Sequence, residues 1–291
     1  MIYEIRNDYL TVRINSIGAE LDSIRSSSGR EYLWQGNPEI WAGRAPNLFP
    51  FVARLRDGQY EMDGKTYSMK IHGFARGSVF TCSEILKDKV RFELEYSDTT
   101  MEVYPRKFRF SITYYLSGSE LHIVFLVENM DEKMMYFGIG GHPGFNIPFE
   151  EDKKFEDYAI VFSEKCTPRR VVFSERTYVD HVENYVLEED RRLPLRHDLF
   201  DFDAIVLTDV SHDLKIISSE SGPYIRVHFP GMNYVGFWHK PRTTAPYVCV
   251  EPWVSLPGDE YEPTIFEKKE DLVSLSPGNT YRNEWFISIK E

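Results

Sequence analysis

The chain has 291 residues and a formal net charge of −12, with 42% hydrophobic and 15% aromatic residues. This acidity disfavours a nucleic-acid-binding surface, which needs clustered Lys and Arg to neutralise phosphates. It also disfavours adhesion to an anionic membrane. A neutral small molecule is the partner that fits this charge best, and the length suffices for one large β domain or two smaller ones.

Apolar and polar residues alternate with a period of two in many short segments, which is typical of half-buried strands. Turn-forming pairs such as Asp57-Gly58, Asp63-Gly64 and Pro277-Gly278 separate them. Helical periodicity is scarce, so we expect an all-β antiparallel sandwich or barrel rather than a βαβ sheet. Without a linker or repeat, residues 1–291 are expected to form one domain. The strand-like segments are 9–14, 90–96, 108–116, 121–129, 158–162, 204–208, 214–218, 224–228, 234–238 and 285–289.

The three cysteines, Cys82, Cys166 and Cys249, lie far apart in the sequence and form no CxxC pair. They are expected to be reduced core residues rather than a disulfide framework or zinc ligands. The first residues carry charges where a signal peptide would be apolar, and no run of about 18 apolar residues occurs. We therefore expect a soluble, cytoplasmic protein.

The first unusual stretch is residues 48–76, LFPFVARLRDGQYEMDGKTYSMKIHGFAR. A hairpin-like signal, from Asp57-Gly58 through Asp63-Gly64, lies between Arg54 and His72 and could bring these two side chains together. The glycine after His72 permits a close backbone approach to a ligand. The alternative interpretation is a structural histidine and a surface arginine.

The second stretch, GGHPGFNIP at residues 140–148, holds His142 among glycines and beside a proline. A loop of this kind exposes an imidazole and restrains it, which suits a general acid or base. An incidental loop histidine is the alternative.

The third stretch is APYVCVEPW at residues 245–253. Glu251 stands at the end of an almost fully apolar strand, where an unsatisfied charge is costly. Desolvation there would raise the pKa of its carboxyl toward the range useful for a base near neutral pH. A structural salt bridge is the alternative.

Together these three stretches resemble the aldose 1-epimerase (galactose mutarotase) family, most closely its shorter LacX-like branch. The closing segment LSPGNTYRNEWFISI is similar to the last strands of the family, so the resemblance covers almost the whole chain. It implies an isomerase on a large antiparallel β-supersandwich that acts on a sugar and needs neither a metal nor another cofactor. In agreement, the sequence has no GxGxxG, P-loop or HExxH motif. A monomer and a homodimer are both compatible with it.

The resemblance also implies roles for individual residues. Glu251 matches the catalytic base of the family and His142 its general acid, while His72 and Arg54 match positions that bind the sugar oxygens. Asp203 is the candidate for the substrate-binding aspartate, although Asp201, two positions away, is an alternative. Trp34, Trp238 and Trp253 are candidates for lining the pocket, where aromatic faces could pack on a sugar, and Trp238 is retained as a substrate-binding residue. Core packing is the alternative, and we expect it for at least two of the three. His239 is either part of this wall or a surface histidine.

Two motifs depart from the longer galactose mutarotases: HGFAR replaces their HGG form, and GHPGF replaces their NHxYFN context. These changes alter the pocket wall and leave the physiological sugar open. A hexose-6-phosphate 1-epimerase is one alternative, because Arg44, Arg54, Arg56 and Arg76 could bind a phosphate. A non-catalytic carbohydrate-binding protein on the same fold is another. A metal-dependent cupin-like enzyme is disfavoured because the eight histidines are dispersed without an HxH pair.

Overall fold

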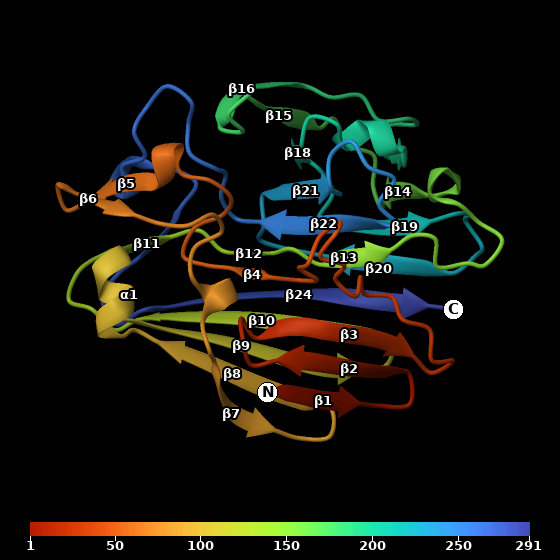
Figure 1. The fold of residues 1–291 in the computed structure, drawn as a ribbon, viewed down its shortest axis with the longest axis horizontal. Coiled ribbons are helices and arrows are strands. Elements are labelled where there is room, and N and C mark those ends of the chain that lie inside the picture. Colours follow the sequence, from red (N-terminus) through yellow and green to blue (C-terminus); the bar gives the residue numbers. More distant parts are fainter.

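The computed structural model describes residues 1–291 and consists almost entirely of antiparallel strands, which confirms the all-β expectation. Its largest element is a sheet of nine strands in the order β17-β14-β19-β20-β24-β10-β9-β8-β7. Figure 1 shows its long members β24, β10 and β9 side by side. The strands are β7 (Thr81–Ile85), β8 (Lys89–Glu95), β9 (Phe108–Ser117), β10 (Glu120–Asn129), β14 (Ala159–Phe162), β17 (Arg192–Pro194), β19 (Asp213–Ile217), β20 (Tyr224–His228) and β24 (Thr280–Lys290).

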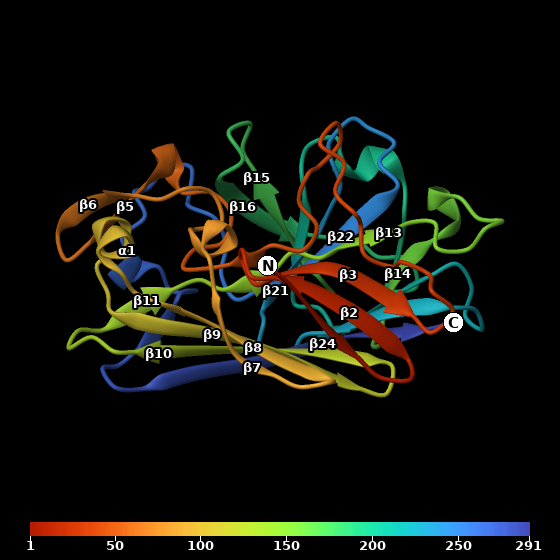
Figure 2. The same cartoon turned by 60° about the horizontal axis from the view of Figure 1, so that its bottom comes forward.

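The second large sheet has eight strands in the order β16-β15-β18-β21-β22-β12-β4, with β13 also paired to β22. Figure 2 shows β15, β16 and β22 above the layer formed by the nine-stranded sheet. The strands are β4 (Asn47–Leu48), β12 (Gly140–Gly141), β13 (Gly144–Asn146), β15 (Arg169–Phe173), β16 (Val179–Asn184), β18 (Ile205–Thr208), β21 (Tyr234–Trp238) and β22 (Tyr247–Trp253).

Three smaller sheets complete the fold. They are β1 (Ile2–Arg6), β2 (Leu10–Asn15) and β3 (Glu20–Ser26); β5 (Gln59–Met62) with β6 (Lys65–Ser68); and β11 (Met135–Phe137) with β23 (Val273–Leu275). The one α-helix is α1 (Asp98–Val103), and the 3-10 turns are η1 (Arg56–Gly58), η2 (Ala75–Gly77), η3 (Phe155–Asp157), η4 (His197–Phe200) and η5 (Phe266–Lys268).

The core follows from the alternation of side chains along the strands. In β10, every second residue from Leu121 to Val127 is fully buried, and the residues between them are partly exposed. The inward side chains join a hydrophobic cluster of 64 buried residues that draws on both large sheets. Burial of apolar area on this scale is the dominant stabilising contribution to the fold.

Strand β22 differs because all seven of its residues are buried. It lies inside the eight-stranded sheet, paired with β21 on one edge and with β12 and β13 on the other. A strand covered on both faces reads as a continuous apolar run, which explains the YVCV sequence. Its one ionisable carboxylic acid, Glu251, is therefore held in the protein interior, and the candidate site is built around it.

Candidate active site

The pocket that contains Glu251 has a volume of about 280 Å³ and opens between the ends of several strands and loops of the eight-stranded sheet. A pocket of this size is near the small end of ligand-binding cavities and suits a single small molecule. It is lined by Trp41, Pro46, Ala53, Arg54, Ile71, His72, Arg76, His142, Phe173, Thr177, Asp203, Ala204, Trp238, Glu251, Trp253 and Pro257.

Glu251 lies at the floor of this pocket with 2% of its surface exposed. On the neighbouring strand β21, the residue opposite Glu251 is Gly236. Burial raises the pKa of the Glu251 carboxyl well above its ordinary value, and the nearby Asp203 carboxylate raises it further.

His142 connects β12 to β13 and is 7% exposed. Its Nε2 lies 3.2 Å from Oε2 of Glu251, and its ring stacks on that of Trp41 with centroids 5.2 Å apart. The preceding glycine is required, because a Cβ at Gly141 would stand 2.6 Å from the Trp285 indole. This close packing explains why the loop is rich in glycine and how it holds the imidazole.

The two groups of this pair are shifted toward their uncharged forms. Burial lowers the pKa of the His142 imidazole to about 3, and the Arg76 guanidinium lowers it as well. Burial shifts the pKa of the Glu251 carboxyl in the opposite direction, upward, so the two changes favour a proton on the carboxyl over one on the imidazole. With the carboxyl ionised and the imidazole protonated, the two groups would form an ion pair across the 3.2 Å contact.

Arg54 and His72 reach the pocket through backbone contacts between their two loops. The His72 N–H donates to the Ala53 carbonyl over 2.9 Å, and the Ala53 N–H donates to Nδ1 of His72 over 3.1 Å. Because Nδ1 accepts this bond, the neutral imidazole carries its proton on Nε2 and is a hydrogen-bond donor there. Burial, followed by the charges of His142, Arg76 and Arg54, lowers the pKa of His72 well below its ordinary value.

Asp203 follows η4 and has a left-handed backbone, with φ of 89°. It lines the pocket beside Trp238, whereas Asp201 belongs to the turn at the end of η4 and does not. Burial raises the pKa of the Asp203 carboxyl, and the Arg54 guanidinium opposes that shift. Asp203 therefore adds a second carboxyl to the same pocket.

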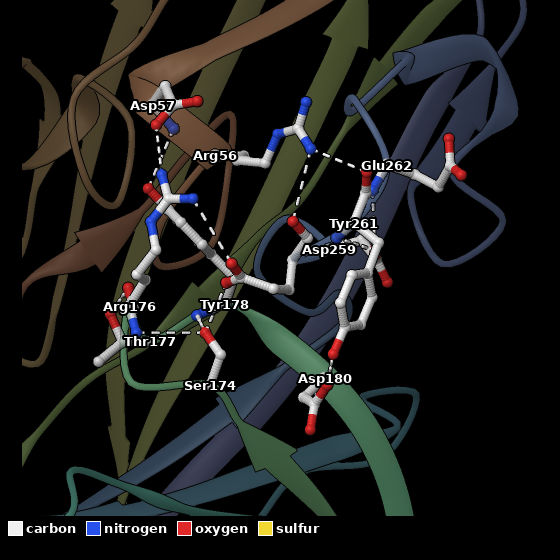
Figure 3. Close-up of polar contacts among 11 residues, drawn as sticks. Arg56, Asp57, Ser174, Arg176, Thr177, Tyr178, Asp180, Asp259, Tyr261 and Glu262 are labelled. Atoms are coloured by element: carbon white, nitrogen blue, oxygen red, sulfur yellow. Dashed lines mark hydrogen bonds and ion pairs between the residues drawn. The ribbon is translucent and has the colours of Figure 1, made fainter.

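Three loops form one edge of the pocket and are tied together by a polar network around Arg176, which is shown in Figure 3. The Arg176 guanidinium lies 2.5 Å from Asp57 and 3.5 Å from Glu260, and the Ser174 hydroxyl donates to Glu260 over 2.6 Å. Thr177, next to Arg176, lines the pocket. The network thus fixes the tip of the β15–β16 hairpin against the two loops that follow Arg54 and Glu251 in the sequence.

Comparison with known proteins assigns this chain to a family. The model of the family described as "Aldose 1-epimerase" matches residues 1–287. The chain belongs to the aldose 1-epimerase family. Within that family it is similar to the plasmid and chromosomal forms of Protein LacX of Lactococcus lactis subsp. lactis, each 33% identical over 299 residues and covered to 99% on both sides.

Solved structures agree. A galactose mutarotase related enzyme from Lactobacillus acidophilus matches with a TM-score of 0.95 at 32% identity, covering 100% of this chain and 98% of its own. A galactose mutarotase-like protein from Lactobacillus casei ATCC 334 matches with a TM-score of 0.94 at 29% identity, covering 100% of both chains. The fold of this family member is therefore the galactose mutarotase-like supersandwich. No helix in its structure has the length and apolar character needed to cross a membrane.

The structure brings all six sequence-predicted site residues of this aldose 1-epimerase family member to one pocket. They are Glu251, His142, Arg54, His72, Asp203 and Trp238. Of the other tryptophan candidates, Trp253 lines the pocket and Trp34 packs in a separate apolar cluster with Tyr247.

Other expectations differ from the structure. His239 is fully buried and accepts or donates a 3.0 Å hydrogen bond with His197, so it is neither a surface residue nor part of the pocket lining. Of the four arginines considered for a phosphate, Arg44 pairs with Asp22 at 2.6 Å, and Arg56 binds the Tyr261 carbonyl at 2.8 Å. Only Arg54 and Arg76 line the pocket. All three cysteines are free, but only Cys249 is buried.

Eight of the sixteen lining residues were not singled out from the sequence: Trp41, Pro46, Ala53, Ile71, Phe173, Thr177, Ala204 and Pro257. Trp41 has the clearest function, since its ring stacks on His142. Its segment carries no strand alternation or motif, and the sequence signal was only a tryptophan near a glycine and an arginine. Phe173 and Thr177 come from a hairpin tip that reaches the pocket through tertiary contacts, which no local pattern indicates.

Proposed function

We propose that this protein is an aldose 1-epimerase that interconverts the α and β anomers of a free aldose. The observation that carries the proposal is the Glu251–His142 pair, which lies 3.2 Å apart in a pocket sized for a small molecule. Membership of the aldose 1-epimerase family supports the reaction class.

Anomer exchange requires two coupled proton transfers. Glu251, as the base, removes the proton from the hydroxyl on C1 while His142, as the acid, gives its proton to the ring oxygen. The bond between C1 and the ring oxygen then breaks and leaves an open-chain aldehyde. Rotation about C1–C2 presents the other face of the carbonyl, and closure returns both protons.

The proton inventory of the pair fits this cycle. Ring opening converts a charged pair, carboxylate and imidazolium, into a neutral one. The neutral pair is the state that burial favours for both residues. Because the pair takes one proton and gives one in each direction, the cycle needs no proton from solvent.

Other lining residues have roles that follow from their chemistry. Arg54 and the Nε2–H of His72 would donate hydrogen bonds to sugar oxygens on which negative charge develops. Asp203 would accept a hydrogen bond from a sugar hydroxyl. Trp41 and Trp238, whose rings meet edge to face at 5.4 Å, offer apolar faces to the C–H groups of a pyranose.

The test is anomer exchange itself. Freshly dissolved α-glucose and α-galactose, each with and without a 6-phosphate, are followed by polarimetry, and exchange at equilibrium is measured by NMR. The proposal expects acceleration above the spontaneous rate that is greatest for a free sugar. Sugar binding without acceleration would instead support a non-catalytic carbohydrate-binding protein.

A second candidate, a hexose-6-phosphate 1-epimerase, is favoured by one observation. Arg54 and Arg76 both line the pocket, and neither guanidinium has an ion-pair partner in the structure. Unpaired arginines are well suited to a phosphate. If this candidate is correct, the 6-phosphates are the better substrates in the same experiment.

A further inference from the structure

Beside the Glu251–His142 pair lies a third chemically reactive side chain that the proposed epimerase reaction does not use. Cys249 precedes Glu251 by two positions on β22, so both side chains point to the same face of the strand. One donor atom from each of Cys249, Glu251 and His142 lies within 4.8 Å of the other two. All three residues are buried.

This set of donors matches the ligands that zinc prefers. A thiolate, an imidazole and a carboxylate are all common zinc ligands in proteins, with bonds of about 2.0–2.3 Å in a tetrahedral arrangement. Bonds of that length separate a nitrogen and an oxygen ligand by about 3.3–3.5 Å. The distance of 3.2 Å between Nε2 of His142 and Oε2 of Glu251 is close to this separation, so these two ligands need little movement to bind one ion.

The charges also balance. A divalent cation bound by one carboxylate, one thiolate and a neutral imidazole forms a site with no net charge, and a neutral site avoids the cost of burying an unpaired ion. Mg²⁺ and Ca²⁺ prefer oxygen ligands, whereas a thiolate selects softer ions such as Zn²⁺. His142 and Glu251 line the pocket, which gives the ion an entry path.

We propose that Zn²⁺ binds to Cys249, His142 and Glu251 and reversibly inhibits the protein. The metal takes the imidazole nitrogen and the carboxylate that would exchange protons with the sugar, so a zinc-loaded molecule cannot open the ring. Cys249 sets the affinity and takes no part in the basal reaction. Only the inhibition rests on the proposed epimerase function; metal binding is independent of it.

Binding is tested on the full-length protein without sugar, by calorimetry with Zn²⁺ and by absorption spectroscopy with Co²⁺ as a zinc substitute. We expect one site and a thiolate-to-cobalt charge-transfer band. Cys249→Ser and Cys249→Ala should weaken zinc binding by at least about tenfold, because loss of even an indirect partner of a ligand costs 10–100-fold. The charge-transfer band should disappear in both variants.

Cys82→Ser and Cys166→Ser are the matched controls, because each removes a free thiol that does not belong to the cluster of Cys249, His142 and Glu251. They should bind Zn²⁺ and Co²⁺ like the unmodified protein. A thermal melt of each variant confirms that it is folded. Absence of the charge-transfer band in the unmodified protein, or zinc affinity unchanged in both Cys249 variants, overturns the proposal.

Inhibition is measured by anomer exchange with added Zn²⁺, with Mg²⁺ as the control ion and a chelator to restore activity. Both Cys249 variants should keep the basal rate and lose zinc sensitivity. Activation by Zn²⁺ would refute the inhibitory role. If no sugar is epimerised at all, the calorimetric and Co²⁺ results still decide whether the metal site exists, so failure of the proposed function is distinguishable from failure of this inference.

Discussion

Replacement of Glu251 by glutamine removes the proposed base and changes little else. The amide has nearly the shape of the carboxylate and can still hydrogen-bond to Nε2 of His142, which lies 3.2 Å from it in the structure. A positioned general base contributes about 10²–10⁴-fold to a rate, or roughly 3–5 kcal/mol of barrier. We therefore expect Glu251→Gln to reduce kcat by that factor while the fold remains intact.

The assay is polarimetry of freshly dissolved α-anomer, with the spontaneous rate subtracted, at several sugar concentrations so that kcat and KM are separated. Glu128→Gln is the matched control, since Glu128 is half-buried on β10 and its ion pair with Arg109 at 3.3 Å lies outside the pocket. That variant should keep the full rate. If Glu251→Gln retained more than about a tenth of the activity, Glu251 would not be the base.

Four further predictions follow from the same geometry. His142→Asn should lower kcat by about 10²–10⁴-fold, measured in the same polarimetric assay, and a near-normal rate would exclude it as the acid. Arg54→Ala should lower kcat/KM by about 10–100-fold through loss of charged hydrogen bonds, and an unchanged kcat/KM would remove it from the binding site. Arg176→Ala should raise KM by about two- to fivefold with kcat nearly unchanged, whereas Arg169→Ala, which breaks an equally exposed 2.5 Å ion pair with Asp209, should change neither. The pKa of Glu251 in the folded protein is raised above its ordinary value of 4.5, so above that pH the folded state holds more protons than the unfolded chain. The unmodified protein therefore loses stability as pH rises from 4.5, whereas Glu251→Gln has no such group to titrate. The free energy of unfolding of Glu251→Gln, relative to that of the unmodified protein, should accordingly increase with pH. Chemical denaturation at pH 5 and pH 8 measures that difference, and an equal difference at both values would contradict the shift.

The fold could be predicted because its main signal is local. Alternation of apolar and polar residues is a direct consequence of strand geometry, and it located segments such as 121–129, which the structure has as β10 (Glu120–Asn129). The hairpin signal at Asp63-Gly64 is the turn between β5 and β6. Turn chemistry and pleat period are properties of a few neighbouring residues, so one sequence suffices to find them.

The site was only partly predictable because it is assembled from distant segments. Glu251 and His142 stood out, since a carboxylate in an apolar run and a histidine among glycines are each unusual in their local context. Trp41 and Thr177 reach the pocket through loops whose paths depend on the packing of the whole sandwich. For His239 neither sequence interpretation holds, because tertiary contacts bury it against His197, away from both the surface and the pocket lining.

Strain in the backbone also concentrates at this pocket. Eleven residues other than glycine have a positive φ in the 291-residue chain, and four of them, Ala53, His72, Thr177 and Asp203, are among the sixteen that line it. A left-handed residue of this kind costs of order 1–3 kcal/mol and persists only where its surroundings hold it. For Ala53 and His72 those surroundings are their mutual hydrogen bonds, and for Thr177 they are the contacts of Arg176. The buried Glu251 adds an electrostatic cost of its own at neutral pH. A protein selected for stability alone would have neither feature. The strained backbone and the buried carboxyl occur together in one cavity, which is the physical reason to regard the pocket as a functional site. The polar network around Arg176 helps to hold that strained backbone in place.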